Sequence, residues 1–240
     1  MSGHSKWSQI KHQKGKTDRL KGQTFTKLGR AITISVKDSG GIYDLASNFK
    51  LRLAVEKARM ANMPKTNIDR AISRGLGKGE AGDLENITYE GFGPGNSAII
   101  IETSTDNRKR TNQTLKNIFY SYDGNLAGPG SVNYLFKTVG QIILKKGERS
   151  EDEYTELVLE VGGDDIEFAG NTVTIYTNIT NLGTVNGDLL KKGEEIETSE
   201  MVKLPIDTIN LDEQDKAKVH KLTEALLEID DVLQVNGNYK

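Results

Sequence analysis

The spacing of hydrophobic residues changes once along this chain, at the glycine-rich stretch 75–79. Before this stretch, apolar residues recur every three or four positions, which is the period of a helix that buries one face. After it, short runs of β-branched residues alternate with helical patterns, which is typical of mixed α+β structure. The chain therefore divides into a helical part and a longer part that must build sheets.

The helical part predicts three helices. The first is marked by apolar residues at steps of three and four, namely Phe25, Leu28, Ile32 and Val36, and Gly40-Gly41 ends it. The second follows Asp44 as its N-cap, with apolar positions at Phe49, Leu53, Val55 and Met60. The third has Pro64 in its first turn, where a missing N–H costs nothing, and stops at Gly75. It buries Ile68, Ala71 and Ile72.

The longer part predicts two α+β units. We expect strands near residues 97–102, 132–136, 141–144, 166, 173–176, 195–201 and 232–235, and helices near 109–122, 151–161, 182–192 and 212–228. Because the last helix and strand would complete either unit, we expect a discontinuous middle domain, 84–137 plus 205–240, with a third domain, 138–204, inserted into it. With a basic arm and helical bundle over 1–77, the expected fold class is multi-domain α and α+β. It has an N-terminal three-helix domain followed by two ferredoxin-like α+β domains.

Charge is distributed unevenly along the chain, although the formal net charge is only −2. Residues 1–75 hold 16 Lys and Arg against 5 Asp and Glu, and residues 76–240 hold 16 against 29. The first 30 residues alone carry 8 basic side chains against the single Asp18. A basic segment on an acidic body indicates a polyanionic partner.

The basic arm at the N-terminus combines lysines with the only tryptophan, Trp7. Lysines attract phosphates through counterion release, and an indole offers a surface on which an unpaired base can stack. A solvated tail with Trp7 packed on the bundle is the alternative interpretation. We predict nucleic-acid contacts from Lys6, Trp7, Lys11, His12, Lys14, Lys16, Arg19 and Lys21.

Further basic side chains continue this predicted surface onto the helices. They are Lys27, Arg30, Arg70 and Arg74, of which the last two are one helical turn apart. Residues 105–111 place Arg108, Lys109 and Arg110 where a strand gives way to a helix, so that backbone N–H groups and cations can hold a phosphate together. The alternatives are ordinary solubilising charges and a capped helix start.

Several classes of protein are excluded by composition and motifs. The absence of cysteine excludes disulfides, thiolate catalysis and zinc fingers, and no His-Glu-x-x-His or Gly-x-Ser-x-Gly motif occurs. The glycine-rich stretch 89–95 lacks the Gly-Lys-Ser/Thr ending of a phosphate-binding loop and more simply shapes a turn. The longest run of strong hydrophobes, 99–101, is too short to span a bilayer, and no apolar segment of a secretory signal follows the basic start. We expect a cytoplasmic non-enzyme with no metal, cofactor, small-molecule substrate or membrane partner.

Seven short blocks along the chain carry a family resemblance. They are Gly3-His4-Ser5-Lys6-Trp7, Ile10-Lys11-His12, Phe25-Thr26-Lys27-Leu28, Asn62-Met63-Pro64, Tyr89-Glu90-Gly91-Phe92-Gly93-Pro94-Gly95, Thr105-Asp106-Asn107-Arg108 and Gly124-Asn125-Leu126. In this order they resemble the YebC/PmpR family of bacterial proteins, whose mitochondrial relatives are translational activators of cytochrome oxidase. The resemblance implies a three-domain fold, a cytoplasmic location and a regulatory role without catalysis. Departures at Phe49, Tyr134 and Asn236 affect local packing rather than the basic arm.

Two functions stay open at this point. Members of this family are described as transcriptional regulators that bind promoter DNA, and others resemble translation factors that act on stalled ribosomes. Lysine contacts with phosphates suit duplex DNA, whereas a flexible aromatic arm suits irregular, partly single-stranded RNA. We expect a nucleic-acid-binding transcriptional regulator, with a ribosome-associated factor that binds rRNA or tRNA as the alternative. A protein-interaction scaffold that uses the acidic domains is a third class.

Overall fold

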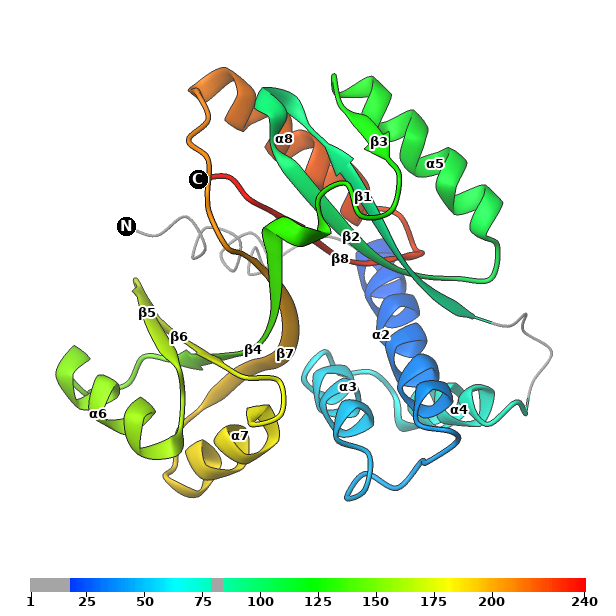
Figure 1. Cartoon of the computed structure of the whole chain (residues 1–240). Helices are drawn as coiled ribbons and strands as arrows, with labels where there is room; N and C mark the ends of the chain where they lie inside the picture. Colours follow the sequence, from blue (N-terminus) through cyan, green and yellow to red (C-terminus); the bar gives the residue numbers. More distant parts are fainter. Residues whose placement is uncertain (1–17, 79–83) are drawn as a thin grey trace. The chain divides into compact units, whose positions relative to one another are not determined.

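The computed structural model describes residues 18–78 and 84–240, with side chains from residue 22 onward. These residues fall into two compact units. One consists of the continuous stretch Phe136–Ile206 with the terminal Lys240, and the other combines the described residues up to Leu135 with Asp207–Tyr239. Figure 1 follows the chain through both units. The chain thus leaves the discontinuous unit once and returns to it.

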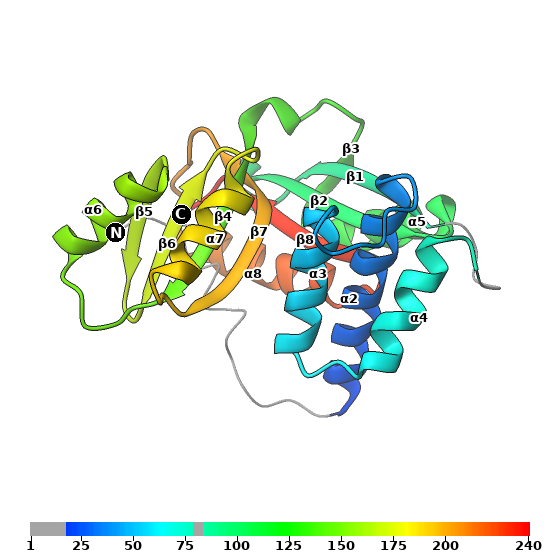
Figure 2. The ribbon, with the colours of Figure 1, turned by 90° about the horizontal axis from the view of Figure 1, so that it is seen from below.

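The discontinuous unit begins with three helices, α2 (Asp18–Asp38), α3 (Phe49–Met60) and α4 (Lys65–Gly75). Helix α2 contacts both of the others, and Figure 2 shows it between them. Their shared core includes Leu28, Ile32, Val36, Leu51, Val55, Ala58, Ile68 and Ala71. The three predicted helices are confirmed, and the apolar residues spaced along the first and third meet in or against this core. Of the apolar positions predicted for the second helix, only Val55 belongs to the core, and Met60 is 51% exposed.

The predicted N-cap of the second helix, Asp44, is wrong. The Asp44 carboxylate accepts a hydrogen bond from the Ser47 hydroxyl at 2.7 Å and so closes a turn ahead of the helix. Helix α3 is capped by Asn48, whose side-chain oxygen accepts the Leu51 N–H at 3.0 Å. The buried Asn48 amide also donates to the Ser35 carbonyl at 2.9 Å. Asn48 therefore caps the helix and ties it to α2, which a local pattern does not reveal.

The same unit contains an antiparallel sheet in the order β3-β1-β2-β8. Its strands are β1 (Glu85–Phe92), β2 (Ala98–Thr105), β3 (Asn125–Ala127) and β8 (Val232–Gly237). Helices α5 (Arg108–Ser121) and α8 (Glu213–Leu227) contact each other and the strands β3 and β8, as Figure 1 shows. Because β8 pairs with β2 across more than a hundred residues, this α+β sheet is completed only by the end of the chain.

Strands β1 and β3 were not predicted, since their residues were expected to form a linker and loops. In β1 the hydrophobic pattern that would identify a strand is interrupted on both faces, by Glu90 on one and by Gly91 on the other. A Cβ at Gly91 would lie 2.7 Å from the Phe119 ring, and the buried Glu90 carboxylate accepts N–H groups of Gly130 at 2.7 Å and Val132 at 2.6 Å. The glycine makes room for an aromatic ring and the carboxylate holds a loop, so hydrophobic alternation is lost.

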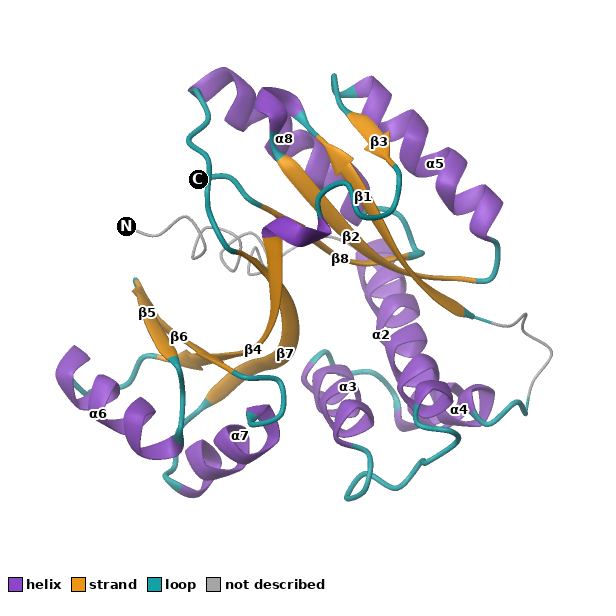
Figure 3. Cartoon of the chain, viewed as in Figure 1, coloured by secondary structure: helices purple, strands orange, loops and turns teal. Residues whose placement is uncertain are grey.

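The continuous unit is a second antiparallel sheet, in the order β5-β6-β4-β7. Its strands are β4 (Phe136–Lys145), β5 (Asp165–Ala169), β6 (Thr172–Thr177) and β7 (Ile196–Pro205). Helices α6 (Glu151–Val161) and α7 (Leu182–Lys191) contact each other and the sheet, as Figure 3 shows. The prediction of separate strands near 132–136 and 141–144 is wrong, because a 3-10 turn (Asn133–Leu135) leads into the single strand β4. The expected fold class, helices followed by two α+β sheets with one inserted, is confirmed.

A helix that crosses a membrane must be both long and apolar. No helix in the described ranges meets both requirements.

Candidate nucleic-acid interface

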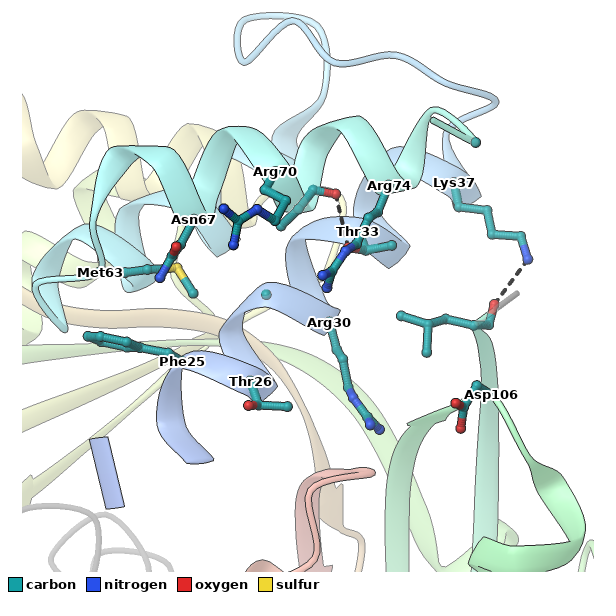
Figure 4. Close-up of a pocket in the computed structure, with 14 residues that line it drawn as sticks. Phe25, Thr26, Arg30, Thr33, Lys37, Met63, Asn67, Arg70, Arg74 and Asp106 are labelled. Atoms are coloured by element: carbon teal, nitrogen blue, oxygen red, sulfur yellow. Dashed lines mark hydrogen bonds between the residues drawn. The ribbon is translucent and has the colours of Figure 1, made fainter. Parts of the chain in front are cut away.

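Helices α2 and α4 line a cavity of about 540 Å³, here named the α2–α4 pocket. Its basic side chains are Arg30, Lys37, Arg70 and Arg74, against one carboxylate, Asp106. Its other lining residues include Phe25, Thr26, Gly29, Met63 and Asn67. Figure 4 shows that these side chains come from facing stretches of the two helices and from the turn between α3 and α4, except for Asp106, which follows β2.

The close approach of the two helices determines the width of this pocket. A Cβ at Gly75 would lie 2.6 Å from the Thr33 carbonyl oxygen and 2.6 Å from Val36 Cβ, so only glycine fits there. The Thr33 hydroxyl donates to the Ala71 carbonyl at 2.9 Å and bonds α2 to α4 directly. Residues three and four apart then share one face of each helix, which brings the polar side chains of both helices to the pocket.

Arg70 and Arg74 are exposed and have no carboxylate partner among the residues that the structure describes. They lie four apart on α4, so their like charges repel each other. The Lys37 ammonium, on the facing side, donates to the Leu84 carbonyl at 3.0 Å. An anion in the α2–α4 pocket would reduce this repulsion, and Arg groups bind phosphate oxygens in pairs of parallel hydrogen bonds.

Asp231 organises a second group of charges, the Asp231 cluster, made of Asp231, Arg30, Arg110, Thr111 and Thr105. Arg30 pairs with the buried carboxylate and donates to the Ser104 carbonyl at 2.5 Å. Arg110 donates to the carboxylate at 3.0 Å, and the Thr111 hydroxyl donates to it at 2.6 Å. Burial by itself would raise the pKa of Asp231, but the hydrogen bonds from Thr111, Arg30 and Arg110 outweigh burial and lower the pKa to about 2.

Lys27 lies one turn before Arg30 and contacts the end of α8. Its ammonium donates to the Leu227 carbonyl, and Gln23 donates to the Glu228 carbonyl at 3.4 Å. Burial lowers the pKa of Lys27 to about 8, partly offset by the nearby Asp230. A cation at the carboxyl end of a helix is favourable, so Lys27 joins α2 to the α+β part of the same unit.

The structure distributes the predicted basic residues among different environments. Arg30, Arg70 and Arg74 line the α2–α4 pocket. Arg30 also pairs with Asp231, and Lys27 and Arg110 are likewise engaged by polar groups of the same unit. Arg108 and Lys109 are exposed on the first turn of α5 and do not line this pocket. The predicted residues Lys6, Trp7, Lys11, His12, Lys14 and Lys16 lie outside the described residues, as do the side chains of Arg19 and Lys21.

Phe25, Lys37 and Asn67 line the α2–α4 pocket but were not predicted as site residues. Their spacing carried a usable signal, because Lys37 lies two turns after Arg30 on α2 and Asn67 lies one turn before Arg70 on α4. Phe25 was assigned only to the helical core, against which it is indeed partly buried.

Comparisons with known proteins agree over nearly the whole chain. A protein of Chloroflexus aurantiacus named "Probable transcriptional regulatory protein" is 43% identical over 240 residues, which covers 99% of this chain and 95% of the relative. A relative of the same name from Persephonella marina is 42% identical over 246 residues, covering 100% of this chain and 96% of the relative. The crystal structure of the conserved hypothetical protein Aq1575 from Aquifex aeolicus is similar, with a TM-score of 0.89 and 40% identity, covering 98% of this chain and 96% of that one.

Family profiles match both parts of the chain. The profile described as the TACO1/YebC protein N-terminal domain matches residues 5–78, and that of the TACO1/YebC second and third domain matches residues 84–239. The resemblance noted in the sequence is therefore confirmed by sequence and by fold. This chain belongs to the TACO1/YebC family.

Proposed function

We propose that this protein is a cytoplasmic regulator that binds nucleic acid through the basic surface of its helical part, without catalysing a reaction. The observation that carries the proposal is the pair Arg70 and Arg74, exposed in the α2–α4 pocket without a carboxylate partner in the described ranges. Guanidinium groups that are not neutralised within the protein favour a phosphodiester backbone, because binding releases the counterions of the phosphates.

Promoter DNA is the first partner that we propose. Relatives that are more than 40% identical are named as probable transcriptional regulatory proteins, which supports a role in transcription. The predicted basic arm would extend the phosphate contacts of the helical part along a duplex.

A role on the ribosome is the second candidate, and a different observation favours it. The α2–α4 pocket includes the apolar groups of Phe25 and Met63 beside its cations. A base stacked inside a duplex cannot reach such groups, whereas the unpaired bases of structured RNA can.

Fluorescence anisotropy with labelled duplex DNA and structured RNA, at several salt concentrations, tests the proposal. We expect Arg70→Gln/Arg74→Gln to lower the slope of log K against log salt by about 2, roughly one for each lost phosphate contact. The matched control is Lys50→Gln/Arg59→Gln, which removes two exposed charges from α3 outside the α2–α4 pocket. Equal losses in the two double variants, or no binding by the unaltered protein, would contradict the proposal.

The choice between the two partners needs a separate measurement. If the promoter function is right, a promoter fragment should compete for the protein at a concentration well over tenfold lower than random duplex requires. If the ribosomal function is right, the protein should sediment with ribosomes, and Arg70→Gln/Arg74→Gln should reduce that fraction.

A further inference from the structure

We propose that the α2–α4 pocket holds a single unpaired nucleotide of a nucleic-acid strand, with its base at the apolar end and its phosphates at the arginines. This inference rests on the proposed function and specifies which form of nucleic acid the site takes. Figure 4 shows Phe25 and Met63 at one end of the α2–α4 pocket, with Asn67 and Arg70 beside them and Arg74 and Lys37 toward the other end. The pocket therefore has apolar groups at one end and cations from there to the other, which suits the base and the anionic phosphate of a nucleotide.

The size of the α2–α4 pocket agrees with one nucleotide rather than a paired duplex. Its volume of about 540 Å³ lies within the roughly 300–1,000 Å³ of cavities that hold small organic ligands. A base can enter a pocket of this kind only when it is unpaired or turned out of its stack. Paired bases would leave the apolar end unused.

Gly29 is the residue whose missing side chain indicates that the cavity holds a ligand. It stands inside the 21-residue helix α2, where glycine weakens a helix relative to alanine. An added Cβ would meet only Met63 Cε, at an ordinary 3.8 Å, so internal packing does not require glycine there. At Gly75, by contrast, the fold leaves no room for a side chain. The missing side chain at Gly29 instead widens the α2–α4 pocket beside Phe25.

The groups around Gly29 match the parts of a base. Phe25 is partly buried against the helical core, which holds its ring in place as a stacking surface. The Asn67 amide makes no side-chain hydrogen bond with any residue in the described ranges, and it offers both a donor and an acceptor. Unpaired bases are recognised through stacking and through hydrogen bonds to their exposed edges.

The test compares three RNA probes that differ only at one position. The first is a duplex with one bulged adenosine, the second has an abasic residue in the bulge, and the third is fully paired. We expect the bulged adenosine to bind about tenfold more tightly than the abasic bulge, which is the effect of one stacked base. The slopes of log K against log salt should agree for these two probes, because their phosphates are the same. The same three probes made of DNA distinguish RNA from DNA as the preferred strand.

Two glycine variants in α2 distinguish an effect on the α2–α4 pocket from an effect on the stability of the helix. Gly29→Ala should reduce the tenfold preference to nearly none while the melting temperature stays the same or rises, because alanine favours the helix. Gly22→Ala is the control, since a Cβ there would meet no described atom within 4 Å, and it should keep the preference.

Each outcome of this experiment has a separate meaning. Equal binding of the adenosine and abasic probes, with Arg70→Gln/Arg74→Gln still weakening both, overturns the nucleotide pocket and leaves the nucleic-acid function standing. A preference that survives Gly29→Ala shows that the base binds elsewhere. Failure of every probe to bind overturns the proposed function itself.

Discussion

The Asp231 cluster and the α2–α4 pocket contain the same kind of side chain in opposite electrostatic situations. Arg110 directs its guanidinium at a buried carboxylate, whereas Arg70 and Arg74 expose theirs with no carboxylate partner in the described part of the chain. Arg30 belongs to both groups, because it pairs with Asp231 and also lines the pocket. A neutralised arginine stabilises the fold, and one that is not neutralised attracts an anion. The partner of an arginine, more than its position in a basic run, indicates its role.

The largest effect that we expect comes from removing the centre of the cluster. Asp231→Ala should lower the free energy of unfolding by about 3 kcal/mol, because it leaves Arg30 partly buried without its counter-charge. Denaturation by urea measures this. The exposed Asp207 of the same unit provides the control, and Asp207→Ala should change the free energy by less than about 0.5 kcal/mol. A similar small change for both variants would show that the cluster does not stabilise the fold.

Acid should weaken the cluster in a defined range of pH. The pKa of Asp231 is about 2 in the folded protein and 3.8 ordinarily, so the unfolded chain takes up the proton first. The stabilisation is therefore complete above about pH 5 and is lost as the pH falls toward 2, by roughly 2 kcal/mol. Urea denaturation at a series of pH values should show the difference between the unaltered protein and Asp231→Asn narrowing over this range. A constant difference would contradict the lowered pKa.

Base should stabilise the fold at the neighbouring Lys27, because a neutral amine is buried at lower cost than an ammonium. The pKa of Lys27 is about 8 in the folded protein and 10.5 ordinarily, so between these values the unfolded chain binds more protons. The free energy of unfolding should then rise with pH from about 8 to 10.5, by roughly 3 kcal/mol. The same titration of Lys27→Met should lack this rise. If the free energy of unfolding of the variant rises as steeply with pH, groups other than Lys27 cause the rise.

The smallest effects provide the sharpest contrast between the two regions. Arg74→Gln should weaken nucleic-acid binding about fivefold, or about 1 kcal/mol, and leave the melting temperature unchanged. Arg110→Gln should do the reverse and lower stability by about 1 kcal/mol with little effect on binding, since its charge is already paired. Fluorescence anisotropy measures the binding of both variants, and thermal melting measures their stability. Variants that lose both properties alike would remove the distinction.

Local patterns predicted the helices well. Helix α6 was expected over 151–161 and occupies Glu151–Val161, because Ser150 and Glu153 form a capping box within one turn of sequence. The N-cap of α3 was missed although its hydrogen bond is local, because the Asn48 side chain accepts the Leu51 N–H three residues on, and Asp44 is also a residue type that caps helices. Strand β1 was missed because its determinant is distant, since Gly91 is explained only by the Phe119 ring.

The candidate site was predicted in part. The sequence indicated a basic surface that included Lys27, Arg30, Arg70 and Arg74, but it did not distinguish among them. Asp231, which pairs with Arg30, lies 201 residues further along the chain. No local spacing can show such a pair, because only the folded sheet brings β8 to β2 and the start of α5.

By itself the sequence determined the helical part, the change to α+β structure, the basic character of the front and the family resemblance. These properties depend on the period of hydrophobic residues and on local charge, which are readable along a few turns of chain. The tertiary structure alone decided which arginines are neutralised, and it placed Phe25, Gly29 and Asn67 around one cavity with those that are not. Electrostatic pairing and cavities depend on distances in space, and folding creates those distances between residues that are far apart in the chain.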